Sequence, residues 1–107
     1  MFPLFQKTAN SIHVNELDPL LNEVNLIDIR EPHEFIRGSI QRAKNIPMRQ
    51  LLNTPTQYLD KNETYYIMCQ SGGRSLGAVS ILQRAGYDVI NVKGGFMGYS
   101  GKNKNRT

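Results

Sequence analysis

The 107-residue chain has one cysteine and no tryptophan. A single cysteine excludes a disulfide within the chain, which fits a reducing compartment. It also excludes a zinc site built from several thiolates, and no pair of histidines at ligand spacing takes their place. We therefore expect neither a bound metal nor a cofactor, and a cytoplasmic location is the default expectation.

Long apolar runs are also missing from the sequence. No stretch approaches the ~18–20 apolar residues of a membrane span. The start of the chain lacks the apolar stretch and the small-residue cleavage site of a signal peptide. We expect no membrane association, and residues 1–10 are interpreted as an N-terminal extension ahead of a single domain, since the length suits one core.

Acidic residues are fewer than basic ones, 9 against 13, which gives a net charge of +4. Part of the excess lies in residues 101–107, a tail without apolar residues that is predicted to be disordered. The other basic residues are scattered along the chain, so nucleic-acid binding is not indicated. A mild preference for small anionic substrates is the better inference.

Short apolar strands alternate with helical stretches over residues 11–100, the expected domain. The helices are predicted around 14–22, from 31 to 38, as one or two short helices within 48–59, over 76–85, and as a short terminal helix after 94–95. The strands are predicted at 11–13, 25–29, 43–46, 64–68 and 88–92. This order predicts an α/β domain with a small parallel five-stranded sheet and helices on both faces.

The most informative segment runs from residue 65 to residue 75 and reads YYIMCQSGGRS. An apolar strand leads directly into Cys69, which opens a short glycine-containing loop in front of an amphipathic helix. Sites in parallel sheets form at the carboxyl ends of strands, and the N-terminus of a helix favours thiolates and bound anions. We therefore predict that Cys69 is a reactive nucleophile. The competing interpretation is a buried structural thiol, the commonest state of a free cysteine.

The loop after the cysteine is predicted to bind substrate through converging N–H groups, and its residues are Gln70, Ser71, Gly72, Gly73 and Arg74. Gly73 is expected to need a positive φ, so that valine there would damage fold and activity. Arg74 has two interpretations. Its side chain either binds the anionic end of a substrate or caps the loop and pairs with a carboxylate.

Charged residues near the second predicted strand suggest a structural network rather than a second site. Asp28 and Arg30 lie at the end of that strand, and Glu34 follows Arg30 by four residues. Inside the predicted helix over 76–85, Gly77 costs about 1 kcal/mol relative to alanine. Close packing of this helix on the sheet is the expected reason for Gly77.

Several segments, in order along residues 12–99, give the chain a resemblance to a known family. They read LIDIREPHEF at 26–35, GSI at 38–40, AKNIP at 43–47, CQSGGRS at 69–75 and GG at 94–95. With these segments the chain resembles a single-domain rhodanese, a sulfurtransferase. The resemblance implies that Cys69 takes a sulfane sulfur from a donor such as thiosulfate and holds it as a persulfide. A small thiol, a protein thiol or cyanide would then accept the sulfur.

Three positions depart from the pattern of that family. Many relatives have histidine where this chain has Ser39, and tryptophan is common where Tyr99 stands. The position after the cysteine is often arginine in relatives and is Gln70 here. This last difference removes one positive charge from the mouth of the loop and bears on the choice of sulfur donor.

Two other function classes compete with the sulfurtransferase hypothesis. Cysteine-dependent phosphatases place arginine six residues after the nucleophile, whereas Arg74 follows Cys69 by five, so the loop suits a single sulfur better than a phosphate. No acid for an alcohol leaving group is identifiable either. The second alternative is a non-enzymatic sulfur carrier or protein-binding module with the same fold. The oligomeric state is not indicated by the sequence.

Overall fold

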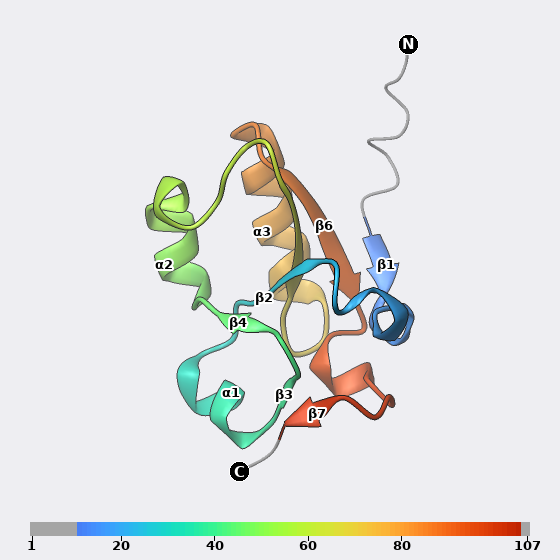
Figure 1. Ribbon diagram of the computed structural model, residues 1–107. Helices are drawn as coiled ribbons and strands as arrows, with labels where there is room; N and C mark the ends of the chain where they lie inside the picture. Colours follow the sequence, from blue (N-terminus) through green and yellow to red (C-terminus); the bar gives the residue numbers. More distant parts are fainter. Residues whose placement is uncertain (1–10, 106–107) are drawn as a thin grey trace.

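A computed structural model of the chain describes residues 11–105 (Figure 1). The extension expected at residues 1–10 and the last two residues lie outside the described part. Five strands form one parallel sheet in the order β1-β6-β5-β2-β4. These strands are β1 Ser11–His13, β2 Asn25–Asp28, β4 Lys44–Asn45, β5 Thr64–Met68 and β6 Asp88–Lys93. The predicted α/β fold with a parallel five-stranded sheet is confirmed.

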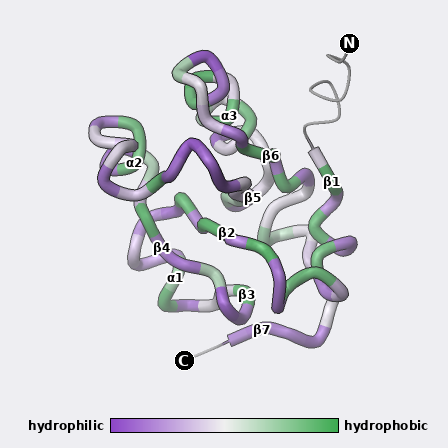
Figure 2. The backbone as a smooth tube through the Cα atoms, turned by 45° about the horizontal axis from the view of Figure 1, so that its top comes forward, coloured by the Kyte–Doolittle hydropathy of each residue, from purple (hydrophilic) through white to green (hydrophobic). Residues whose placement is uncertain are grey.

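Apolar side chains form two clusters, one on each face of the sheet. The helices α2 (Met48–Asn53) and α3 (Gly73–Arg84) pack on one face, where Leu51, Val79 and Leu82 share a cluster with strand residues. On the other face, Val14 of the 3-10 turn η2 (Val14–Glu16) and the two leucines that flank the 3-10 turn η3 (Asp18–Leu20), Leu17 and Leu21, belong to the second cluster. Figure 2 shows hydrophobic and hydrophilic segments alternating along α3, as expected for a helix with one buried face.

Helix α3 differs from the prediction in its start and in the width of its buried face. It begins at Gly73 rather than at residue 76, so its first turn belongs to the loop that follows Cys69. Leu76 and Ile81 are 60% and 48% exposed, so the buried face of the helix excludes two of its large apolar residues. A Cβ atom on Gly77 would meet nothing within 4 Å. Close packing therefore does not explain Gly77, and that interpretation was wrong.

Of the remaining helical segments, those predicted at 14–22 and after 94–95 are 3-10 turns rather than α-helices. Helix α1 (Pro32–Arg37) begins after Glu31 and ends at Gly38, as predicted. The single helix expected at 14–22 is instead the pair η2 and η3, because Pro19 lacks an N–H group and disfavours the α conformation before it. Pro55 separates α2 from the turn η4 (Pro55–Gln57). The terminal helix is the 3-10 turn η5 (Phe96–Gly98).

The C-terminal segment is ordered as far as the structure describes it, which corrects the prediction of a disordered tail over residues 101–105. Strand β7 (Lys104–Asn105) pairs antiparallel with β3 (Ser39–Ile40), and neither strand was predicted. The buried Tyr99 donates its hydroxyl proton to Asp18 and accepts the N–H of Asn103 at 2.9 Å. Within the described residues, no helix is long and apolar enough to cross a membrane.

Candidate active site

Cys69 lies directly after β5 and is 1% exposed. Its Sγ accepts the N–H groups of Gly72 at 3.1 Å and of Ser75 at 3.3 Å, and lies 3.4 Å from Ser75 Oγ. Burial raises the pKa of the Cys69 thiol, but hydrogen bonds from Ser75, Gly72 and Ser71 outweigh burial, and the net pKa is lowered. We call residues 69–75 the sulfur cradle, because their donors surround Sγ and favour the thiolate.

The glycine that shapes the cradle is Gly72, which has a φ of +105°. The next residue, Gly73, lies in helix α3 without a positive φ, and a Cβ atom on it would meet nothing within 4 Å. Our prediction of a positive φ at Gly73 was therefore wrong by one residue. A side chain at position 72 would be strained by its φ and would also lie 3.3 Å from the backbone nitrogen of Gly94.

The turn after β6 is hydrogen-bonded to the backbone of the sulfur cradle. The N–H of Phe96 donates to the carbonyl of Cys69 at 2.9 Å, and the N–H of Met97 donates to that of Gln70 at 2.8 Å. These bonds bring Gly95 so close that an added Cβ atom would lie 2.5 Å from backbone atoms of Cys69 and Gln70. Glycine is thus required at position 95 by the close approach of two backbone segments, a contact that the sequence motif alone did not indicate.

A polar contact beneath the cradle was missed by the sequence analysis. Ser75 is fully buried, and its hydroxyl oxygen lies within hydrogen-bond distance of both Cys69 Sγ and Oδ1 of the buried Asn91 on β6, so its one proton is shared between these two acceptors. The same hydroxyl oxygen lies 3.2 Å from the carbonyl of Gly72. The sequence did contain one indication of this contact, because the polar Asn91 lies between the apolar residues Ile90 and Val92. Asn91 therefore positions the side chain that contacts the Cys69 sulfur.

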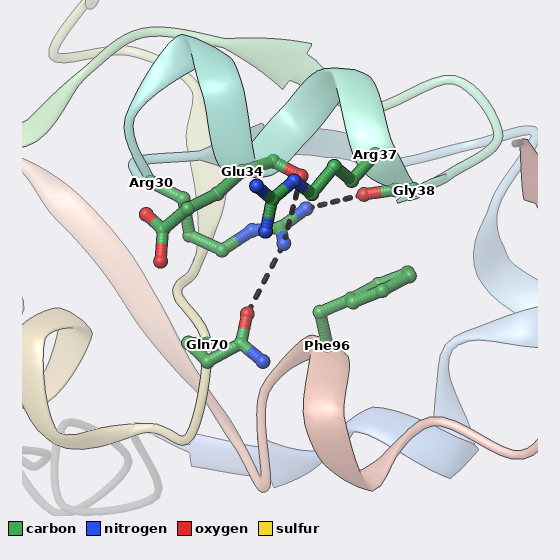
Figure 3. Close-up of a pocket in the computed structure, with 6 residues that line it drawn as sticks. All are labelled: Arg30, Glu34, Arg37, Gly38, Gln70 and Phe96. Carbon is green, nitrogen blue, oxygen red and sulfur yellow. Dashed lines mark hydrogen bonds between the residues drawn. The ribbon is translucent and has the colours of Figure 1, made fainter. Parts of the chain in front are cut away.

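Arg30 organises the second part of the site and is 2% exposed. Its guanidinium group forms a 2.8 Å salt bridge with Asp28 and donates to the carbonyls of Gly38 at 2.7 Å and Glu34 at 3.4 Å. It also donates to Oε1 of Gln70 at 3.1 Å (Figure 3). The predicted network is present, although Glu34 enters it through its backbone carbonyl rather than its carboxylate.

Arg74 pairs with a carboxylate, one of its two predicted alternatives. Its guanidinium nitrogens lie 3.1 and 3.2 Å from the carboxylate oxygens of Glu34, and the two side chains are 41% and 26% exposed. The hydrogen bond from Arg74 lowers the pKa of Glu34, and the same bond raises the pKa of Arg74. The pair ties α1 to the first turn of α3.

A pocket of about 320 Å³ lies on the side of Gln70 that faces α1 and η5. Its lining residues come from three separate parts of the chain and are Arg30, Glu34, Arg37, Gly38, Gln70 and Phe96. The ring of Phe96 lies against Arg30, whose Cζ is 4.5 Å from the ring centroid. No group of three or more His, Cys, Asp or Glu side chains among residues 11–105 is placed to hold a metal ion.

The structure is thus a parallel α/β domain with a buried cysteine at the carboxyl edge of its sheet, whose sulfur accepts backbone N–H bonds. Residues 13–102 match the family model of the rhodanese-like domain, and the chain belongs to that family. The thiosulfate sulfurtransferase PspE of Escherichia coli (strain K12) is 32% identical over 78 residues, which are 72% of this chain and 75% of that protein.

Two further relatives cover most of the chain. The protein YtwF of Bacillus subtilis (strain 168) is 37% identical over 82 residues, which are 77% of this chain and 79% of its own length. The crystal structure of a rhodanese-like domain protein from Staphylococcus aureus matches with a TM-score of 0.81 and 35% identity. That match covers 92% of this chain and 98% of the other, so the fold and the family agree.

Proposed function

We propose that this protein is a sulfurtransferase that moves a sulfane sulfur from a donor such as thiosulfate to a thiophilic acceptor through a persulfide on Cys69. The observation that carries the proposal is the set of N–H donors around Cys69 Sγ. They favour the thiolate, which is the form of cysteine that attacks sulfur. Sulfurtransferases among the relatives support the same chemistry.

The first half of the reaction needs no general acid. The Cys69 thiolate attacks the sulfane sulfur of thiosulfate, the S–S bond of thiosulfate breaks, and sulfite leaves with the bonding electron pair. The persulfide carries one negative charge on its outer sulfur. The N–H groups of Gly73 and Arg74 support this anion, because they belong to the first turn of α3 and have no acceptor among the described residues.

The second half returns the cysteine to its starting state. A thiolate or cyanide attacks the outer sulfur, the new S–S or C–S bond forms, and Cys69 leaves as a thiolate with the electrons of its own S–S bond. In this scheme Cys69 is the nucleophile, and the substrate-binding groups are the backbone N–H donors of Gln70, Ser71, Gly72, Gly73 and Arg74. The acceptor is a small thiol, a protein thiol or cyanide. The expected cytoplasmic location continues to rest on the sequence.

A sulfur carrier is the second candidate function, because one relative, YrkF, is named as a sulfur carrier protein. A phosphatase is less well supported, since the guanidinium group of Arg74 pairs with Glu34 instead of facing an anion in the loop. A carrier and an enzyme would both form the persulfide. They differ in whether sulfur leaves repeatedly for a small acceptor.

Mass spectrometry of the intact protein after incubation with thiosulfate tests the proposal. We expect a gain of one sulfur atom in the wild type and none in Cys69→Ser. Multiple turnovers of thiocyanate formation from thiosulfate and cyanide would then identify an enzyme rather than a carrier. A wild-type protein that gains no sulfur from any sulfane donor would refute the sulfurtransferase proposal.

A further inference from the structure

The amide group of Gln70 has a fixed orientation at the edge of the cradle. Arg30 can only donate hydrogen bonds, so the atom of Gln70 that faces its Nη1 at 3.1 Å is the carbonyl oxygen Oε1. Figure 3 shows this oxygen turned to Arg30 and the amide nitrogen turned away from it. No described group accepts from that nitrogen. Gln70 therefore offers free N–H donors beside the pocket.

Arg37 adds a second set of free donors at the end of α1. Its exposed side chain lines the same pocket and forms no hydrogen bond or ion pair with residues 11–105. The tail strand β7 brings another cation near, because Lys104 Nζ lies 5.4 Å from the ring centroid of Phe96. The free polar groups that line the pocket are thus the Gln70 amide nitrogen and the Arg37 guanidinium, both of them donors, and Lys104 adds a positive charge nearby.

The negative charges around the pocket already have partners. The carboxylate of Glu34 pairs with Arg74 at 3.1 Å, and Asp28 pairs with the buried Arg30 at 2.8 Å. The positive charges of Arg37 and Lys104 have no such partner among the described residues. An anion entering the pocket therefore meets the unpaired guanidinium of Arg37 and the free N–H groups of Gln70.

The size of the pocket exceeds that of the sulfur donor. Its volume is about 320 Å³, whereas thiosulfate has only five heavy atoms. The half-buried ring of Phe96 gives the pocket an apolar wall, which suits a carbon chain. Gln70 lines the pocket and follows Cys69 directly in the chain. The pocket therefore borders the sulfur cradle at Gln70.

We propose that this pocket binds the carboxylate of a small anionic thiol that accepts the sulfur, with Arg37 and the amide of Gln70 as the recognition groups. The inference rests on the proposed function of Cys69. The acceptor's thiolate attacks the outer sulfur of the persulfide, the Cys69 S–S bond breaks, and Cys69 leaves as a thiolate. The thiol proton goes to the buffer, and no oxidant or reductant is required.

Single-turnover kinetics tests the assignment. Protein loaded with thiosulfate and desalted reacts with 3-mercaptopropionate or with the uncharged 2-mercaptoethanol, and the ratio of the two rate constants is measured. Comparing this ratio between variants cancels the intrinsic reactivity of each thiol. We expect Arg37→Gln to lower the ratio about tenfold, as loss of a charge-assisted hydrogen bond does, and Arg37→Lys to restore part of it. Arg49→Gln is the matched control, an exposed arginine away from this pocket that should leave the ratio unchanged.

A second variant reports on the amide. Gln70→Glu keeps an oxygen for Arg30 but replaces the free N–H donors with a carboxylate oxygen, so the ratio should fall below that of the wild type. Equal ratios in wild type, Arg37→Gln and Arg49→Gln would overturn the pocket assignment while leaving the persulfide chemistry intact. A protein that takes up no sulfur at Cys69 would overturn both proposals together, so the two failures are distinguishable.

Discussion

The sulfur cradle and the pocket beside it share Gln70, but they are built in different ways. The cradle surrounds Cys69 with N–H groups and one hydroxyl from within residues 69–75. The pocket is lined mainly by side chains from α1, the loop and η5. Backbone donors are present whatever the side chains are, so the cradle suits chemistry common to a family. Side-chain donors change by substitution, so the pocket is where this chain can select its partner.

Gly95 supports both regions, and replacing it should have the largest effect. Its φ of 59° and ψ of −166° fall where essentially only glycine is stable. An added Cβ atom would also lie 2.5 Å from the cradle backbone. Strain of ~1–3 kcal/mol and overpacking of ~1–3 kcal/mol together predict that Gly95→Ala loses about 2–6 kcal/mol in urea unfolding. Persulfide formation should be lost with it.

The matched control for Gly95→Ala is Gly77→Ala on the exposed side of α3. A Cβ atom at position 77 meets nothing within 4 Å, so alanine should stabilise the protein by about 0.5–1 kcal/mol through helix propensity. If Gly95→Ala unfolds at the wild-type urea concentration and still forms the persulfide, the cradle and the pocket are not held by the turn after β6.

The cradle was predictable from the sequence because its parts are contiguous. A strand rich in β-branched and aromatic residues, a cysteine, a glycine pair and an amphipathic helix follow one another within residues 64–84. What the sequence did not resolve was which of two adjacent glycines takes the positive φ. The start of α3 at Gly73 decides it, because a helical residue has a negative φ and the left-handed position falls to Gly72.

The pocket was not predictable, because it joins side chains that lie far apart in the chain. Arg37 and Phe96 are separated by 59 positions, and neither belongs to an apolar pattern that would indicate its neighbours. The ordered tail was unpredictable for the same reason, because its contacts join segments that are far apart in the chain. Residues 101–105 contain no large apolar side chain that would indicate packing. They are held by hydrogen bonds from Asn103 to the Tyr99 hydroxyl and from Gln41 to the Asn103 carbonyl, and by the pairing of β7 with β3.

Ser75→Ala should change the cradle while leaving the pocket intact. Loss of the hydroxyl removes a hydrogen bond that lowers the pKa of Cys69, so this pKa should rise. The rate of Cys69 alkylation by iodoacetamide follows the thiolate fraction, and its pH profile should move to higher pH than in the wild type. Asn91 also loses its hydroxyl partner, which predicts a loss of about 1–3 kcal/mol in stability.

The ratio of acceptor rate constants provides the control for Ser75→Ala, because Arg37 and Gln70 do not contact Ser75. We expect both rate constants to change together and their ratio to remain that of the wild type. A pH profile that does not move would show that the backbone N–H groups alone set the pKa of Cys69.

Arg74→Gln should have the smallest effect, because the Arg74–Glu34 pair that ties α1 to α3 is partly exposed. Exposed pairs contribute at most about 1 kcal/mol, and we expect a loss in that range at pH 7. The pair lowers the pKa of Glu34 below its ordinary value of 4.5. Its contribution is therefore complete above pH 4.5 and disappears as the pH falls through the lowered value. Urea unfolding of both proteins at several pH values should show the two stabilities converging in acid.

The same variant separates the two roles considered for Arg74. The guanidinium group faces Glu34, and the N–H of residue 74 is retained in any substitution, so the rate of persulfide formation should change less than about tenfold. Glu34→Gln is the matched partner variant and should reproduce the same small loss of stability. If Arg74→Gln slows persulfide formation much more than Glu34→Gln does, the guanidinium group contacts the sulfur donor, and the cradle would then depend on a side chain in the way the pocket does.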